Sequence, residues 1–215
     1  MSDLGDALER DAAALGLSLS PAQRDQLLAY LQLLLRWNAT YNLTAVRDAE
    51  AMRTQHLADC LAVVPPLRRH LGGREARLLD VGSGGGLPGV VLAVLMPSLA
   101  VTCVDTVGKK AAFVRQVAAE LHLPNLRAEH ARVERLSGEF DVITARAFAT
   151  LAELITLTRQ RLAAGGAWMA MKGKHPEDEL AALPADAEVF HVEHLDIPGL
   201  AAERCLVWMR LRDGA

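Results

Sequence analysis

The sequence predicts an α/β fold, in which a doubly wound, mostly parallel sheet follows an N-terminal helical segment. From Arg77 onward, short apolar runs alternate with helical periodicities, a pattern typical of parallel strands joined by crossover helices. Before that point the apolar residues follow helical spacing instead. Two late apolar runs, 188–195 and 205–211, flank a turn at Pro198-Gly199. They predict an antiparallel hairpin that completes a seven-stranded sheet.

The N-terminal segment carries a strong helix-start signal. Ser20-Pro21-Ala22-Gln23 combines a serine cap, a proline in the first turn and a glutamine three residues after the cap. We expect this helix to end at Trp37-Asn38. A second helical stretch begins near Asp48 and ends at Pro65-Pro66. The residues that follow, 68–74, contain two glycines and are expected to form a linker.

The rest of the chain supplies five strands and three helices before the hairpin. The expected strands are 78–81, 101–105, 126–129, 141–145 and 167–171, and the expected helices are 87–96, 108–121 and 151–162. We therefore divide the chain into a helical extension, residues 1–74, and a Rossmann-like core, residues 75–215. The two parts are expected to form one compact unit.

The composition fits a folded globular protein. Of 215 residues, 51% are apolar and 23% are charged, which excludes a disordered chain and a coiled coil. The longest apolar run, Val90 to Met96, is far shorter than the roughly 18 residues of a membrane span. The acidic N-terminus lacks the features of a secretory signal. Cys60, Cys103 and Cys205 have no CxxC spacing, so neither a disulfide framework nor a zinc site is expected. Cys103 lies inside the second expected strand, and Cys60 and Cys205 are expected to be core thiols. The prediction is a cytoplasmic protein with no metal and no membrane contact.

The net charge of −3 excludes a protein that is basic as a whole. The charge is unevenly distributed, however. Residues 31–75 carry six basic and four acidic side chains, and residues 105–127 carry four and two. These blocks form either a local basic face or scattered solvated charge, and composition alone leaves both interpretations open.

The most informative segment is the glycine-rich run 80–89, which follows a predicted strand and opens a helix. Gly84, Gly86 and Gly89 match the GxGxxG pattern of dinucleotide-binding loops. Asp80, however, precedes the glycines where such folds carry an apolar residue. A carboxylate there repels a pyrophosphate but suits a cation such as the sulfonium and amino groups of S-adenosylmethionine. The residues thus favour S-adenosylmethionine, with a nicotinamide dinucleotide as the alternative.

Further positions fit a cofactor that contains a nucleoside. Asp105 ends the second strand about twenty residues after Gly84, where an acid can accept hydrogen bonds from both ribose hydroxyls. Because both candidate ligands contain a ribose, Asp105 does not distinguish them. Val133 and Glu134 follow the third strand, where such folds bind an adenine. For Glu134 the alternative is a helix-capping role.

The fourth strand ends in Thr144-Ala145-Arg146-Ala147-Phe148, at the position that faces the reacting atom in methyltransferases. The [Asp/Asn/Ser]-Pro-Pro-aromatic loop typical of exocyclic amine methylation is missing. No cysteine is placed for carbon methylation either. Elimination leaves an acceptor with a free in-plane lone pair, such as purine N7, which needs no general base. Arg146 is the candidate at the junction of cofactor and acceptor, where it can bind the cofactor carboxylate or a phosphate.

Basic and aromatic residues outline a candidate RNA-binding surface. Lys172 and Lys174 end the fifth strand at the same rim, and Lys109 opens a helix where lysine gains nothing from the helix dipole. Residues of the helical extension can form a cap that stacks on an RNA base and binds the RNA backbone. Its residues are Trp37, Tyr41, Asn42, Arg47, Arg53 and His56. The alternatives are a solvated loop for the lysines, core packing for the two aromatic residues, and a structural role for His56.

Several motifs, in order and from about residue 5 to the end, resemble those of one family. They are Trp37-Asn38, Tyr41-Asn42-Leu43-Thr44, His56-Leu57-Ala58-Asp59, the run 80–89, Asp105 to Lys110, Phe113 to Gln116, Arg132-Val133-Glu134, Arg146 to Ala149 and Lys172-Gly173. The chain resembles the bacterial ribosomal small-subunit methyltransferase G family, also called glucose-inhibited division protein B. Two departures are Gly84-Gly85-Gly86, where many members have Pro or Ala in the middle, and Thr106-Val107, where Ser is common.

The resemblance implies transfer of a methyl group from S-adenosylmethionine to N7 of one guanine, guanine 527, in the decoding-region loop of 16S rRNA. It also implies the small ribosomal subunit or an assembly intermediate as partner, and we expect a monomer. By motif, the family's cofactor contacts fall on Gly82, Leu87, Asp105, Val133, Glu134 and Arg146. The full expected cofactor set is Asp80, Gly82, Gly84, Gly86, Leu87, Asp105, Val133, Glu134 and Arg146. The expected RNA contacts are Asn42, Arg47, His56, Lys109, Lys172 and Lys174.

Three other functions remain as alternatives. The first is a methyltransferase that acts on another RNA, a protein or a small molecule. The second is a non-enzymatic RNA-binding protein that uses the same fold as a scaffold. The third is a nicotinamide-dependent oxidoreductase, for which the sequence offers no obvious catalytic Tyr-Lys or His-Asp pair.

Overall fold

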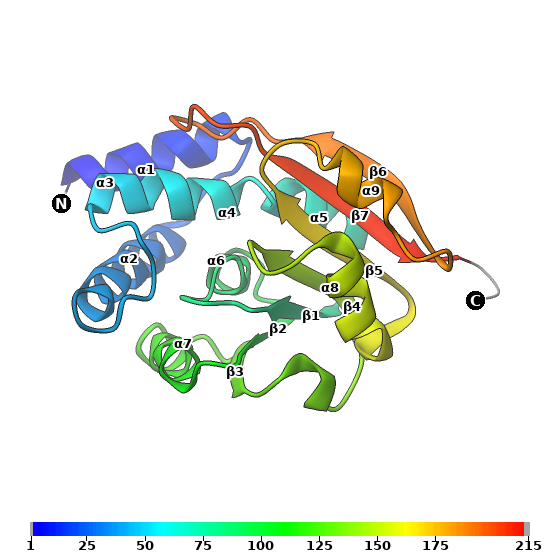
Figure 1. The fold of residues 1–215 in the computed structure, drawn as a ribbon. Helices are drawn as coiled ribbons and strands as arrows, with labels where there is room; N and C mark the ends of the chain where they lie inside the picture. The colour runs from blue at the N-terminus through cyan, green and yellow to red at the C-terminus, as the bar shows by residue number, and fades with distance from the viewer. Residues whose placement is uncertain (1, 213–215) are drawn as a thin grey trace.

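A seven-stranded sheet runs through the part of the chain that the structure describes, residues 2–212, in a computed structural model (Figure 1). The strand order is β3-β2-β1-β4-β5-β7-β6. Strands β1 to β5 pair in parallel, whereas β7 is antiparallel to both β5 and β6. The strands are Ala76–Val81 (β1), Leu99–Asp105 (β2), Leu126–His130 (β3), Phe140–Arg146 (β4), Leu162–Lys172 (β5), Ala187–His194 (β6) and Cys205–Leu211 (β7). The predicted fold class and C-terminal hairpin are confirmed.

Helices precede the sheet and connect its strands. The helices of the N-terminal part are Ser2–Ala14 (α1), Pro21–Tyr41 (α2), Ala49–Met52 (α3), the π-helical turn Arg53–Ala58 (η1), Asp59–Leu61 (α4) and Val64–Leu71 (α5). Those of the core are Gly89–Leu95 (α6), Gly108–Glu120 (α7), the 3₁₀ turns Val133–Arg135 (η2) and Arg159–Arg161 (η3), Leu151–Thr158 (α8) and Glu177–Ala181 (α9). None of the described helices is long and apolar enough to cross a bilayer.

The apolar side chains of the sheet pack into two layers. On one face, Leu78 and Val101 join a cluster with residues of α2, α6, α7 and the other N-terminal helices. On the opposite face, Leu79, Ile143 and Trp168 pack with apolar residues of α8. Neighbouring residues of β1 thus point to opposite faces, as the two-residue period of a strand requires. All three cysteines are free and buried, which confirms the prediction that Cys60 and Cys205 are core thiols.

Helix α2 ties the helical extension to the glycine-rich loop. The hydroxyl of Tyr30, which is fully buried, donates a 2.6 Å hydrogen bond to the carbonyl of Gly85. Side-chain amides of Gln23 and Gln26 donate to the carbonyls of Val94 and Leu121. The extension and the core therefore share one apolar cluster. The division at residue 74 stays a prediction.

The expectation of a linker over residues 68–74 is wrong. Helix α5 occupies Val64–Leu71, and Pro65 and Pro66 lie in its first turn instead of ending the preceding helix. A first-turn proline lacks only an N–H that has no partner within the helix. Gly72, with φ of +57°, caps the helix in the left-handed conformation.

Other boundaries shift by a few residues. Helix α2 continues past Trp37-Asn38 to Tyr41, and Asn42 ends it with φ of +49°. The helix expected over 151–162 ends at Thr158, because η3 and then β5 begin there. Strand β5 is correspondingly longer than predicted, and the short helix α9 is not predicted at all.

Candidate functional site

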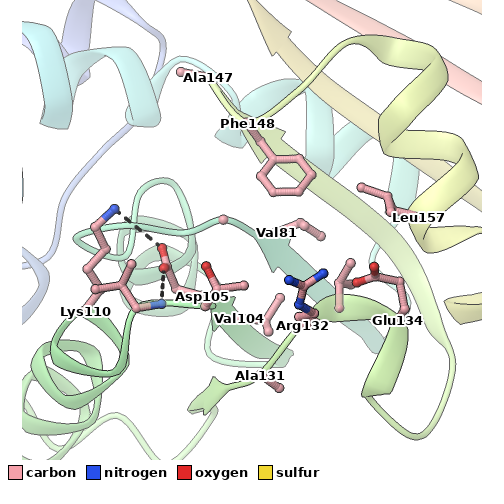
Figure 2. A pocket seen from close by; sticks show the side chains of 14 residues that line it. Val81, Val104, Asp105, Lys110, Ala131, Arg132, Glu134, Ala147, Phe148 and Leu157 are labelled. Carbon is pink, nitrogen blue, oxygen red and sulfur yellow. Dashed lines mark hydrogen bonds and ion pairs between the residues drawn. The ribbon is translucent and has the colours of Figure 1, made fainter.

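A cavity of about 440 Å³ opens at the carboxyl ends of β1, β2, β3 and β4 (Figure 2). Its lining residues follow these four strands and include a few from helices α7 and α8. They are Val81, Gly82, Val104, Asp105, Thr106, Val107, Lys110, Ala131, Arg132, Val133, Glu134, Ala147, Phe148 and Leu157. Strand β1 lies between β2 and β4, so the cavity occupies the position where the strand order reverses. Open α/β sheets bind their ligands at this position.

The glycine-rich loop shapes one wall of the cavity. Gly82 has φ of +65° and lines the cavity, and a Cβ atom there would lie 2.3 Å from the ring of Phe148. Gly86 has φ of +85°, and its own Cβ would lie 2.5 Å from Val90. Leu87 is buried behind the loop. Gly82 therefore faces the cavity, whereas Gly86 and Leu87 are not among its lining residues and pack against the protein interior.

Asp105 organises the mouth of the cavity. One carboxylate oxygen accepts a 3.0 Å hydrogen bond from the N–H of Gly84, and the other accepts a 2.8 Å bond from the N–H of Val107. The ammonium group of Lys110 lies 3.8 Å away (Figure 2). Each carboxylate oxygen has a second lone pair, so the group can still accept from a ligand hydroxyl. Asp105 is therefore suited to hold the ribose of a nucleoside, as its place in the sequence predicts.

Asp80 does not face the cavity, contrary to the expectation of a direct contact with a cationic ligand. The side chain is fully buried, and its Oδ2 accepts a 2.8 Å hydrogen bond from the N–H of Gly89. The thiol of Cys103 lies 3.8 Å from the same oxygen. Burial raises the pKa of Asp80 from 3.8 to about 7, although the Gly89 hydrogen bond lowers it. A carboxyl group that is partly protonated at neutral pH is a weak basis for selecting a cation by charge.

Val133 and Glu134 lie in the 3₁₀ turn η2 and both line the cavity (Figure 2). Val133 is buried and offers an apolar surface, while Glu134 is exposed. The residue at the start of this turn, Arg132, makes no capping hydrogen bond through its side chain. Among the described residues, none forms an ion pair with Glu134, so its carboxylate is free to accept from a ligand. An adenine beside this turn stays a prediction.

Arg146 is held by the helical extension, a feature that sequence reasoning missed. Its Nη1 donates to Oδ2 of Asp59 over 3.1 Å and to the carbonyl of Gln55 over 3.3 Å. Oδ1 of Asp59 accepts from Nε of Arg204 over 2.9 Å. Asp59 is only 1% exposed. The only sequence signal is that Asp59 belongs to the resemblance motif that begins with His56.

His56 is buried and engaged within the protein. Its Nδ1 lies 2.9 Å from the carbonyl of Gln55, and its Nε2 lies 2.7 Å from the hydroxyl of Thr44. These partners assign the proton to Nδ1, which leaves Nε2 to accept from Thr44. Burial and the nearby charge of Arg146 lower the pKa of His56, in keeping with a neutral ring. A direct contact of His56 with RNA does not fit this geometry, since neither ring nitrogen is free.

The predicted basic residues differ in their surroundings. Lys172 pairs with Glu179 over 2.7 Å and donates to the carbonyl of Ala149, so its charge is compensated. Lys174 is exposed nearby. Lys109 lies 6.0 Å from the centre of the Tyr41 ring, within range of a cation–π contact.

An exposed surface of four residues, Tyr41, Asn42, Arg47 and Lys109, lies beside the start of α7; we call it the Tyr41 surface. Tyr41 is 41% exposed and packs on Trp37, with ring centres 5.0 Å apart. Trp37 in turn contacts the buried Phe113. The side chain of Arg47 donates to Asn42 over 3.3 Å. Trp37 therefore packs largely against the core, whereas the ring of Tyr41 is exposed to solvent.

The cavity fits S-adenosylmethionine by its donor and acceptor set. Asp105 has spare lone pairs for ribose hydroxyls, Val133 and Glu134 offer an apolar and a polar contact for a base, and Gly82 leaves the backbone uncovered by a Cβ. The first turn of α6 has no side-chain cap, but Asp80 already accepts the N–H of Gly89 there. A pyrophosphate would compete with this carboxyl group for the same helix end.

Solved structures share the fold of this chain. TrmN from Thermus thermophilus superimposes with a TM-score of 0.57 at 20% identity, covering 74% of this chain and 53% of that one. Coclaurine N-methyltransferase bound to N-methylheliamine and SAH gives a TM-score of 0.53 at 13% identity, covering 90% and 73%. At these identities the likeness shows the fold alone. The chain therefore has the fold of the class I S-adenosylmethionine-dependent methyltransferases.

The family follows from the sequence comparisons. Residues 23–207 match the model of the rRNA small subunit methyltransferase G family. A ribosomal RNA small subunit methyltransferase G from Leptothrix cholodnii is 64% identical over 98% of this chain and 97% of its own length. Its counterpart from Acidovorax ebreus is 60% identical over 97% and 96%. The chain belongs to this family, and it is an S-adenosylmethionine-dependent rRNA methyltransferase.

The raised pKa of Asp80 predicts how the stability of the folded protein depends on pH. In the folded protein the carboxyl group keeps its proton up to about pH 7, whereas in the unfolded chain it loses the proton near 3.8. The folded state therefore binds more protons between these values, and this contribution to stability falls as the pH rises from about 4 to 7. We expect Asp80→Asn to remove that dependence, so that its stability relative to wild type improves with rising pH. Urea unfolding at several pH values measures the difference. A difference that stays constant across this range would contradict the buried, protonated carboxyl group.

Proposed function

We propose that the enzyme transfers a methyl group to N7 of guanine 527 in the decoding-region loop of 16S rRNA. The observation that carries this proposal is the identity of 64% and 60%, over nearly the whole chain, with enzymes named as ribosomal RNA small subunit methyltransferase G. The end of β4 supports it. The residues there read Arg146-Ala147-Phe148-Ala149, without the proline pair that exocyclic amine methylation uses.

The neighbouring ionisable groups also fit an acceptor that needs no base. Burial and the charge of Arg146 lower the pKa of His56, and both of its ring nitrogens are engaged, while Asp80 is buried behind the loop. Guanine N7 carries no proton and presents its lone pair in the plane of the ring. The protein then has only to align the acceptor and exclude water, an orientational gain of about 7–11 kcal/mol at best.

The residues around the cavity have separate tasks in this proposal. S-adenosylmethionine, when bound, supplies an electrophilic methyl group. Asp105 holds the ribose hydroxyls, and Glu134 and Val133 contact the adenine. The guanidinium of Arg146 binds the cofactor carboxylate. Phe148, which is 37% exposed and lies over Gly82, shields the reacting atoms from water.

The Tyr41 surface is proposed to contact the RNA beside the target guanine. An exposed aromatic ring with arginine and lysine side chains is the combination that binds unpaired nucleotides, by stacking and by charge. Lys174, which directly follows β5, is proposed to add a further exposed positive charge for the RNA. Lys172 contributes less, because Glu179 compensates its charge. The proposed substrate particle is the small ribosomal subunit or an assembly intermediate, and the enzyme is proposed to act as a monomer in the cytoplasm.

Mapping the modified nucleotide tests the activity. The purified enzyme is incubated with small-subunit rRNA and labelled S-adenosylmethionine, and the RNA is then treated with borohydride and aniline, which cleave at N7-methylguanine. We expect one cleavage site, in the decoding-region loop. Label recovered at an exocyclic amine, on a ribosomal protein or on a small molecule would reject the proposal in favour of another methyltransferase activity.

Salt dependence tests the Tyr41 surface. Arg47→Ala combined with Lys109→Ala removes two phosphate contacts, so the slope of log affinity for rRNA against log salt should decrease by about 1.4 for single-stranded RNA. Arg210→Ala is the control, because Arg210 is an exposed arginine that pairs with Glu188 of the edge strand β6, and β5 and β7 lie between that strand and the cavity strands. A slope unchanged in the double variant would exclude these two residues as phosphate contacts.

A further inference from the structure

Asp59 joins two arginines that are far apart in the sequence. Its Oδ2 accepts from Nη1 of Arg146 at the end of β4, and its Oδ1 accepts from Nε of Arg204 just before β7. Asp59 is 1% exposed, so both contacts are shielded from solvent. The N-terminal helices thereby reach the edge of the cavity at the residue expected to meet the cofactor.

The π-helical turn Arg53–Ala58 supplies a second acceptor for the guanidinium of Arg146. π-Helical turns widen the backbone and are frequent at functional sites. Here the carbonyl of Gln55 accepts from Nη1 of Arg146 over 3.3 Å and from Nδ1 of His56 over 2.9 Å. Nη1 of Arg146 thus has two acceptors, both supplied by residues 55 and 59 of the helical extension.

The other side of the Arg146 guanidinium remains available. Nη2 lies 3.5 Å from Nδ1 of His56, but that nitrogen carries a proton and cannot accept. Within residues 2–212, no other acceptor contacts Nη2 or Nε. The side chain is 22% exposed, and the next two residues, Ala147 and Phe148, line the cavity. Arg146 therefore keeps donors for a ligand beside the cavity.

The charges of the cluster also favour an anionic ligand. Arg146 is a cation, and its free donors face no carboxylate among the described residues. A carboxylate that binds to the free side of a guanidinium forms the strong, oriented hydrogen bonds for which arginine is suited.

We propose that Asp59 is a positioning residue for methyl transfer: together with the carbonyl of Gln55, it fixes the guanidinium of Arg146 so that the free donors bind the carboxylate of S-adenosylmethionine. The inference rests on the proposed role of Arg146 at the cofactor. It makes the helical extension part of the cofactor site, in addition to any contact that the extension makes with RNA.

A double-mutant cycle tests this coupling by calorimetric titration with S-adenosylmethionine in the absence of RNA. We expect Asp59→Asn to raise the dissociation constant about tenfold, and Arg146→Ala to raise it at least as much. In the Arg146→Ala background, Asp59→Asn should have no further effect, because the group that it positions is gone. Asp59→Glu, which keeps the charge, should recover part of the affinity.

Two variants separate positioning from general stability. Asp11→Asn removes another buried carboxylate, which pairs with Arg53 of the same π-helical turn but does not touch Arg146. Arg204→Gln removes the second partner of Asp59 and leaves its contact with Arg146. Both should bind the cofactor with the wild-type dissociation constant, and urea unfolding shows that each variant is folded at the titration temperature.

The outcomes distinguish the inference from the function on which it rests. A folded Asp59→Asn protein with unchanged cofactor affinity overturns the inference, and so does an equal loss in the wild-type and Arg146→Ala backgrounds. Weakened rRNA binding with normal cofactor affinity also overturns it, since the anion would then be a phosphate. If Arg146→Ala itself binds the cofactor normally, the proposed cofactor role of Arg146 fails, whereas rRNA methylation by that variant still tests the activity separately.

Discussion

The cavity depends on one carboxylate, that of Asp105, which is satisfied mainly by backbone N–H groups. By accepting from Gly84 and Val107, it joins the loop after β1 to the start of α7. Both segments contribute lining residues, Gly82 and Val107, so hydrogen bonds of 3.0 and 2.8 Å fix their positions at the cavity. Because the carboxylate is only 7% exposed, loss of either bond would leave a poorly solvated charge. The same oxygens keep lone pairs for ribose hydroxyls, so the group that shapes the cavity is also the group proposed to bind the ribose of the ligand.

Two acids at the ends of neighbouring strands have different tasks because their surroundings differ. Asp105 ends β2 at the surface of the cavity, whereas Asp80 in β1 lies below the glycine-rich loop with its pKa raised to about 7. Asp80 holds the beginning of α6 through Gly89, where a Cβ atom would lie 2.4 Å from the thiol of Cys103. We therefore propose that the residues that face the cavity select the cofactor, and that Asp80 acts on it only through the loop.

Much of the fold, and several residues that line the cavity, could be predicted from local sequence. The alternation of strands and helices, the run 80–89 and the acid at 105 are signals within a few residues of the structure that they specify. The contacts of Arg146 could not be predicted in this way, because its partner Asp59 lies 87 residues earlier and the π-helical turn has no sequence signature of its own. The linker expected at 68–74 failed for a related reason: a proline pair can begin a helix as well as end one, and only the packing of α5 decides between them.

The central claim is that the cavity organised by Asp105 binds S-adenosylmethionine rather than a dinucleotide. Competitive equilibrium dialysis of wild type and Asp105→Asn measures this most directly, with labelled S-adenosylmethionine and excess unlabelled NAD. The account predicts that wild type retains the label in the presence of NAD and that Asp105→Asn binds at least about tenfold more weakly, since it loses a charged acceptor for the ribose hydroxyls. Displacement of the label by NAD, or an affinity unchanged in folded Asp105→Asn protein, would contradict it.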